Sequence, residues 1–362
     1  MGRLRGGDTF AGTSRVDAGA LKSKTQRLPD RENPAVFPAP ETPHGASLQW
    51  GGSPTLRPPV PALLHHATLH PEEPWLFYPE GWDWRWLSWR DAARRMALWT
   101  RAFLDFPNLP PGSRVAFAGG AHPAAVLLDL ALQAAGLVAV PLDLNPDEDS
   151  SGKLLDLRCR AWAEPDDGWS PALPAEVRRI RLPNRRIVPS EDLFFEPREG
   201  GGAVAWREGV PLELSVADLA AWAALLEERV GPSREVERDI LALGGSLHGW
   251  AERGMLAWAT TAAAALLLEP AREPEARIRA AVWARATVCH GSAADLRFLR
   301  SLLPRDRRRF WLWGPRRTAA PVRRPFGRLR TLVLAGREPL TPGETAGWGE
   351  RGVTIVDLPT VV

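Results

Sequence analysis

The pattern of apolar and polar positions between residues 59 and 362 predicts alternating helices and strands. In "LSWRDAARRMALWTRAFL", Ser88 is placed as a helix N-cap with Asp91 three residues later, which is a helix-start pattern. An apolar stripe with helical spacing follows, so we predict a helix here. The stripe consists of Ala92, Met96, Trp99 and Phe103.

The next segment predicts a parallel βαβ unit. "PPGSRVAFAGG" is a turn followed by a short strand, and "LVAVPLDL" is a second buried strand. Between them, "HPAAVLLDLALQAAG" has the pattern of a helix with Pro123 in its first turn and Gly136 at its end. Strand, helix and strand in this order predict two parallel strands joined by a helical crossover.

The alternation resumes after a polar, Pro-rich stretch at residues 145–200. Ser215 predicts the start of a helix over 216–230 that ends at Gly231. We therefore expect an α/β fold with layered, largely parallel sheets flanked by helices. The later segments that alternate between strand and helix are "DILALGG", "GWAERGMLAWATTA", "AALLLE", the helix after Pro274, "ATVCHG", "AADLRFLRSLL", "LRTLVLAG" and "GVTIVDL".

Composition separates the first 58 residues from the rest of the chain. Residues 1–58 are rich in Gly, Pro, Arg and Ser and have no apolar periodicity, which predicts a disordered tail or a translation start placed too far upstream. They hold eight Lys or Arg against five Asp or Glu, whereas the remainder holds 38 of each. We expect this neutral remainder to form two α/β subdomains, at residues 59–200 and 201–362.

Cysteine and hydropathy patterns favour a soluble, cytoplasmic protein. Cys159 and Cys289 lie far apart, with no Cys-x-x-Cys and no His at metal-ligand spacing, which fits a reducing compartment and no metal site. The longest apolar stretch, Gly254 to Leu268, is short for a membrane span, and the N-terminus has no apolar signal core. We expect no membrane span.

The segment "EGGGAVAWREGVPLELSVADL", residues 199–219, has the order of a phosphate-binding loop. It contains a glycine run, a short apolar strand, a loop and a helix. A loop that binds polyphosphate also needs cationic side chains and hydroxyl donors, and this one lacks lysine, serine and threonine. A plain strand and turn is therefore the preferred interpretation of the segment by itself.

Several ordered segments resemble the N-terminal part of the adenylate-forming superfamily, the AMP-binding relatives of acyl-CoA synthetases. The segments "AVLLDLALQAAGLVAVPLDLNP", "LALGGSLHGWAERGMLAWATTAAAALLLEP" and "LRTLVLAGREPLTPGETAGWGERGVTIVDL" carry it, and it extends over residues 60–362. The resemblance implies ATP-dependent activation of a carboxylic acid, as in fatty acid metabolism, with ATP/AMP and Mg²⁺ as cofactors. An acyl substrate, CoA or an acyl carrier protein would be its partners.

The resemblance also assigns site residues. His248 and Gly249 would lie beside the acyl pocket with Pro339, although a half-buried histidine next to a helix start is the alternative for His248. In the family's phosphate-loop position, "AVAW" is the expected strand and "LELSVADLAAW" the expected helix, so that only residues 207–211 separate them. The residues expected to bind cofactor are Arg207, Gly209, Gly336, Arg337 and Glu338.

This sequence lacks several parts of the family's active site, which predicts an inactive enzyme. Glu208 would repel a triphosphate, and Arg207 would offset it only in part. Lys153 is the only lysine after residue 24, so we expect no catalytic lysine and assign no catalytic residue. "DLPTVV" replaces the family's Tyr-Gly-x-Thr-Glu motif and has no carboxylate after Asp357 for Mg²⁺, and the family's C-terminal domain would follow Val362.

The preferred hypothesis is a degenerate or truncated synthetase-like protein that is not catalytic alone. Two alternatives stay open. The first is an active acyl-activating ligase whose C-terminal domain comes from a separate chain, with Arg207 in place of the lysine. The second is a nucleic-acid-binding module, because residues 305–330 hold ten arginines against Asp306 alone, interleaved with aromatic residues. A solvated, Arg-biased connection is the preferred interpretation of that segment, and the sequence does not predict an oligomeric state.

Overall fold

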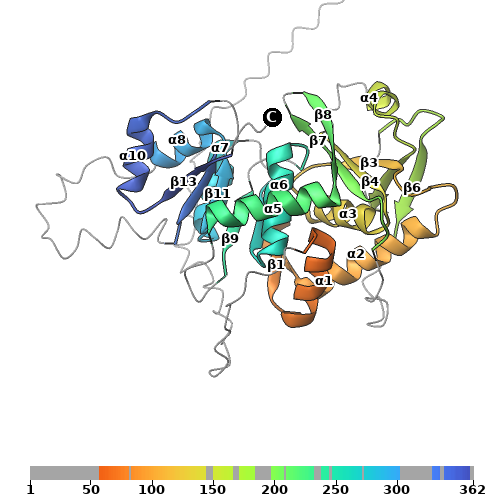
Figure 1. The fold of residues 1–362 in the computed structure, drawn as a ribbon, viewed down its shortest axis with the longest axis horizontal. Coiled ribbons are helices and arrows are strands. Elements are labelled where there is room, and N and C mark those ends of the chain that lie inside the picture. The colour runs from red at the N-terminus through yellow and green to blue at the C-terminus, as the bar shows by residue number, and fades with distance from the viewer. Residues whose placement is uncertain are drawn as a thin grey trace, which may run out of the picture. The chain divides into compact units, whose positions relative to one another are not determined.

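The computed structural model has two β-sheets flanked by helices in the part of the chain that it describes (Figure 1). The chain divides into residues 1–52 and 53–362, and every described residue lies in the second unit. Apart from residues 57 and 58, the segment expected to be a disordered tail lies outside the described residues. Described are residues 57–80, 83–143, 150–165, 171–183, 197–207, 209–231, 238–243, 247–270, 273–301, 328–334 and 338–358.

The first sheet contains the predicted parallel βαβ unit. Its strand order is β6-β5-β3-β4-β7-β8, and all neighbouring strands are parallel except the antiparallel pair β7 and β8. The strands are β3 (Arg114–Ala118), β4 (Val138–Leu142), β5 (Ala161–Pro165), β6 (Arg178–Leu182), β7 (Gly202–Arg207) and β8 (Val210–Ser215).

The second sheet has the order β13-β12-β11-β9-β10-β1-β2 and is also parallel, except for the antiparallel pair β1 and β2 at one edge. Its strands are β1 (Pro74–Glu80), β2 (Asp83–Ser88), β9 (Ile240–Leu243), β10 (Ala265–Leu268), β11 (Val288–Gly291), β12 (Thr331–Leu334) and β13 (Thr354–Asp357).

Sheet membership does not follow a division of the chain at residue 200. The segment 202–215 adds two strands to the first sheet, whereas the early segment 74–88 adds two to the second. These pairings join segments far apart in sequence, which local apolar patterns do not specify. The subdomain boundary at residue 200 stays a prediction.

The helices form layers on both faces of the sheets, as expected. One apolar core joins α1, α2, α3, α5 and α6 to the facing sides of both sheets, and α5 and α6 lie between the sheets (Figure 1). Separate clusters bury the other sheet faces, against α7, α8 and α10 on the second sheet and against α4 on the first. The helices are α1 (Pro59–Leu69), α2 (Trp89–Leu104), α3 (Pro123–Ala134), α4 (Ser150–Asp156), α5 (Val216–Val230), α6 (Trp250–Thr261), α7 (Pro274–Trp283), α8 (Ala293–Ser301) and α10 (Pro342–Gly349).

The predicted helix starts and ends are confirmed where sequence provides a cap. The Asp91 backbone N–H donates to Ser88 Oγ at 3.1 Å, and the predicted apolar stripe of α2 is buried. Ser215 and Asp218 form a reciprocal capping box at the start of α5. Gly136 follows α3 with φ +75°, and a Cβ there would lie 2.7 Å from the Glu199 carbonyl oxygen, so glycine is required.

A buried ion pair joins α6 to the first sheet and its helix α3. Arg253 of α6 and Asp129 of α3 are each 1% exposed, and the Arg253 guanidinium donates to the Asp129 carboxylate. Gln133 Nε2 donates to the second carboxylate oxygen at 2.9 Å, and Arg253 also donates to the Val204 carbonyl oxygen of β7 at 3.4 Å. Burial raises the pKa of Asp129, and the neighbouring Arg253 and Gln133 oppose that increase.

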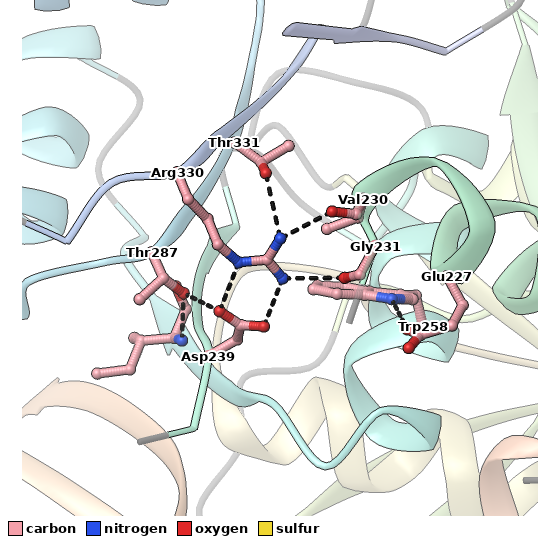
Figure 2. Close-up of polar contacts among 9 residues, drawn as sticks. Glu227, Val230, Gly231, Asp239, Trp258, Thr287, Arg330 and Thr331 are labelled. Atoms are coloured by element: carbon pink, nitrogen blue, oxygen red, sulfur yellow. Dashed lines mark hydrogen bonds and ion pairs between the residues drawn. The ribbon is translucent and has the colours of Figure 1, made fainter. Parts of the chain in front are cut away.

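A second arginine joins the end of α5 to the residues at which parallel strands of the second sheet begin. Figure 2 shows the Arg330 guanidinium donating to both carboxylate oxygens of Asp239, at 3.0 and 2.6 Å. The same guanidinium donates to the carbonyl oxygens of Val230 and Gly231, at the end of α5. Thr287 Oγ1 donates to Asp239 at 2.7 Å, so three strand starts share one polar network.

Aromatic rings and one arginine surround His66 on α1. The His66 ring is 7% exposed and lies 4.9 Å from the Trp89 ring. Its Nε2 lies 3.3 Å from the Thr261 carbonyl oxygen and donates to it, while its buried Nδ1 has no hydrogen-bond partner. Burial is the main cause that lowers the pKa of His66 from 6.5 to about 4, and nearby His65, Arg238 and His70 lower it further.

We predict that Arg253→Met lowers the free energy of unfolding by about 3–5 kcal/mol, because it leaves the Asp129 carboxylate buried without its cation. The double variant Arg253→Met/Asp129→Leu removes both charges and is expected to recover most of that loss. Urea unfolding of the wild type, both single variants and the double variant gives the coupling. A double variant as unstable as the sum of the single variants would contradict this interpretation.

We predict that unfolding stability falls as pH falls from 6.5 towards 4, because unfolded His66 binds a proton in this range while folded His66 does not. The loss attributable to His66 is expected to reach about 3 kcal/mol below pH 4, from the size of the pKa shift. In His66→Gln the pH dependence of the unfolding free energy should flatten between these limits. His65→Gln is the control and should retain most of the slope.

Candidate functional site

The segment expected to replace a phosphate-binding loop is a β-hairpin. Strands β7 and β8 pair continuously from Gly202 opposite Ser215 to Arg207 opposite Val210. Only positions 208 and 209 separate the two paired strands, and Gly209 has φ +82°, a backbone conformation that favours glycine. Two residues of sequence therefore connect the paired strands.

The expectation that "LELSVADLAAW" is entirely helical is wrong for residues 212–215. These residues form the end of β8, and α5 begins only at Val216. The reason is local: Leu212 and Leu214 alternate with polar neighbours as in a strand, and Ser215 uses its side chain to cap the helix. Strand β7 is therefore followed by a second strand and not directly by a helix.

Three of the residues assigned by resemblance lie together at the end of β7 and the start of α6. The rings of Trp206 and His248 are stacked, with centroids 4.1 Å apart and planes 17° apart. The Trp206 backbone N–H donates to the His248 carbonyl oxygen at 3.0 Å, and Trp206 forms an isolated parallel bridge with Gly249. The Arg207 guanidinium lies 6.0 Å from the ring centroid of Trp250, over its face.

The N-terminus of α6, which would otherwise favour a bound anion, carries its own carboxylate. Gly249 is the N-cap residue of α6 and offers no side-chain cap. Glu252, in the first turn, lies so close that a Cβ on Gly249 would be 1.9 Å from Glu252 Oε2. A negative side chain in this position compensates the positive end of the helix dipole. An incoming phosphate would meet that negative charge.

The remaining assigned residues lie between β12 and α10 or at the hairpin turn. Gly336 and Arg337 lie outside the described residues. Glu338 is exposed and pairs at 2.5 Å with Arg297, which also donates to Glu344 at 2.9 Å. Pro339 is exposed, and Gly209 has open space around it. The structure thus brings together Arg207, His248 and Gly249, whereas Glu338 is engaged by Arg297.

The aromatic partners in this cluster were not among the predicted site residues. Trp206 and Trp250 are adjacent in sequence to assigned residues, but tryptophan is so abundant in this chain, with 17 residues, that neither was singled out. Trp250 also contacts Trp222 of α5, with ring centroids 4.9 Å apart. The position of each tryptophan next to an assigned residue was the signal that could have identified it.

Other expected features can be placed only in part. Cys159 and Cys289 are free and buried, and burial raises the pKa of each thiol to about 12. Across the described ranges, no three His, Cys, Asp or Glu side chains gather as metal ligands. Nor is any helix in those ranges sufficiently long and apolar to span a membrane. Of the arginine-rich segment 305–330, residues 305–327 lie outside the described residues.

Comparison with solved structures shows the fold of this chain. No protein-family model matches the sequence, and no curated protein matches it. The nonribosomal peptide synthetase FmoA3 in its AMPPNP-bound form has 17% identity and a TM-score of 0.63, over 83% of this chain and 31% of that one. The N-terminal domain of FACL13 from Mycobacterium tuberculosis has 16% identity and a TM-score of 0.59, over 83% and 75%.

A fatty acyl CoA synthetase from Mycobacterium tuberculosis is similar over 82% of this chain and 58% of its own, with 16% identity and a TM-score of 0.57. This chain therefore spans less than two thirds of the synthetase chains that it matches, but three quarters of the isolated N-terminal domain. The expected α/β fold, that of the N-terminal part of adenylate-forming enzymes, is confirmed.

We predict that Gly254→Ala lowers the free energy of unfolding by about 1–3 kcal/mol, as overpacking in a core does. A Cβ at Gly254 would lie 1.2 Å from Trp222 Nε1, so the indole that supports Trp250 must move. Gly343→Ala in α10 is the matched control, because its Cβ would meet nothing within 4 Å. The control should be neutral or up to about 1 kcal/mol more stable in urea unfolding.

Proposed function

We propose that this protein is an acyl-CoA synthetase-like protein that does not form acyl-adenylates by itself. The observation that carries the proposal is the direct pairing of Arg207 with Val210. An ATP triphosphate needs a loop whose backbone N–H groups surround its oxygens, together with cations that neutralise its charge. A two-residue turn between paired strands offers neither the length nor the free N–H groups for such a loop.

The charges around the hairpin support the same conclusion. Arg207 is the nearest cation in the sequence, and its guanidinium already lies over Trp250. Glu252 occupies the start of α6 and would repel phosphate there. Lys153, the only lysine after residue 24, lies on α4 and is exposed. The residues present therefore do not fit ATP and Mg²⁺ in the manner that the resemblance implies.

The stacked pair Trp206 and His248 is the part of the site that we propose to retain ligand binding. Both rings are partly buried and lie at the carboxyl end of β7, the end of the strands where α/β proteins generally bind ligands. A planar or apolar acyl group would gain from contact with the stacked rings. We propose an acyl acid, or an acyl group carried by CoA or a carrier protein, as the ligand of a cytoplasmic protein.

We predict that the purified chain releases no pyrophosphate from Mg-ATP above the protein-free rate, across a panel of fatty and aromatic acids. The reason is the missing triphosphate site. An active acyl-CoA synthetase in the same assay is the positive control. Release that is lost in Arg207→Ala would overturn the proposal. Release that appears only when a separately produced C-terminal domain is added would instead support the two-chain ligase.

Calorimetric titration tests the binding of acyl ligands separately from the adenylation reaction. A non-hydrolysable acyl-adenylate analogue and the free acid should bind, and His248→Ala should weaken both. Mg-ATP should bind no more tightly than AMP. Binding of the acid that is unchanged in His248→Ala would exclude the Trp206–His248 pair as the acyl contact.

A further inference from the structure

A polar pocket lies at the end of the first sheet where its parallel strands begin. It has a volume of about 460 Å³ and opens beside the turn that leads into β3. The stacked rings of Trp206 and His248 lie at the other end of these strands, because β7 runs parallel to β4 and Trp206 is near its carboxyl end. The lining residues are Pro110, Pro111, Gly112, Ser113, Arg114, Arg158 and Arg160.

Hydrogen bonds of Arg114 connect it to Arg160 and to the turn that contains Arg158. Arg114 is the first residue of β3, and its carbonyl oxygen accepts from the Arg160 N–H at 2.9 Å. Arg158 lies in the turn between α4 and β5 with φ +52°, a left-handed conformation that is uncommon for a residue with a side chain. Arg114 Nη1 also donates to the Leu157 carbonyl oxygen at 3.0 Å, which joins the turn to β3.

The pocket has more positive than negative charge. Arg114 pairs with Glu213 of β8 at 2.6 Å. Arg158 and Arg160 are exposed, and neither forms an ion pair with an acidic side chain anywhere in the described part of the chain. One carboxylate thus compensates three guanidinium groups, in a chain whose residues after 58 have equal numbers of each charge. The excess is local.

The shape and chemistry of the pocket define the class of ligand. A guanidinium group presents a planar set of donors that matches phosphate oxygens in pairs. A volume of about 460 Å³ is in the range of small-molecule sites, and the walls are mainly polar. A compact, highly charged molecule suits it better than an acyl chain does.

We propose that Arg114, Arg158 and Arg160 form a binding site for a phosphorylated small molecule, separate from the Trp206–His248 face. Arg158 and Arg160 supply the unpaired charge, and Arg114 positions the pocket while sharing its own charge with Glu213. The site is independent of the proposed acyl-binding function.

The test is calorimetric titration of the whole chain with inorganic diphosphate at low and moderate salt. We expect saturable one-site binding that weakens at least tenfold in Arg158→Gln/Arg160→Gln. The charge-matched control is Arg279→Gln/Arg351→Gln, which removes two exposed arginines of α7 and of the turn after α10. It should bind like the wild type, as should His248→Ala, so failure here is distinguishable from failure of the proposed function.

Three results would overturn the proposal. The first is no binding of diphosphate at millimolar concentration by the folded wild-type chain. The second is equal weakening in both double variants, which would mean nonspecific charge attraction. The third is binding of a single-stranded oligonucleotide or of phosphatidate-containing vesicles that is tighter than diphosphate and is lost in the same variant. Circular dichroism and a melting temperature confirm that each variant is folded.

Discussion

The buried pair of Arg253 and Asp129 is the contact on which the geometry of the candidate site depends. Both groups are removed from water, so α6 cannot slide or rotate against α3 without separating two charges in the interior. The helix start is fixed in turn, because the Leu247 N–H donates to the Gly119 carbonyl oxygen at the end of β3. These two contacts position the chain on either side of His248, whose ring stacks on Trp206.

The sequence predicted those parts of the fold that are encoded locally. Caps at Ser88 and Ser215, the proline and glycine that bound α3, and the apolar stripe of α2 each act within a few residues, so their consequences follow from spacing alone. The resemblance assigned residues 212–215 to a helix, whereas the Ser215 cap placed the helix start at 216. The alternation of Leu212 and Leu214 with polar neighbours fits a strand, and these residues pair with β7.

Long-range contacts were beyond reach of the sequence for a different reason. The Trp206–His248 stack, the contact of Arg207 with Trp250 and the addition of β1 to the second sheet join residues separated by dozens to nearly two hundred positions. Arginines are so frequent in this chain that abundance carried no information about Arg158 and Arg160. Their significance comes from the lack of an acidic partner within the described part of the chain, which depends on the three-dimensional arrangement.

Two arginine networks stabilise the described fold, and the residues that form them are distinct from those expected to bind cofactor. Arg253 joins α6 to Asp129 of α3 and to the Val204 carbonyl oxygen of β7. Arg330 joins the end of α5 to Asp239 at the start of β9. Neither Arg207 nor Gly209, the two residues here that were expected to bind cofactor, takes part in these networks. Shortening a flexible loop lowers the entropy lost on closing it, by about 0.6 kcal/mol for each halving of length. Replacing such a loop by a tight turn therefore favours folding slightly, and stability alone would not preserve a phosphate-binding loop.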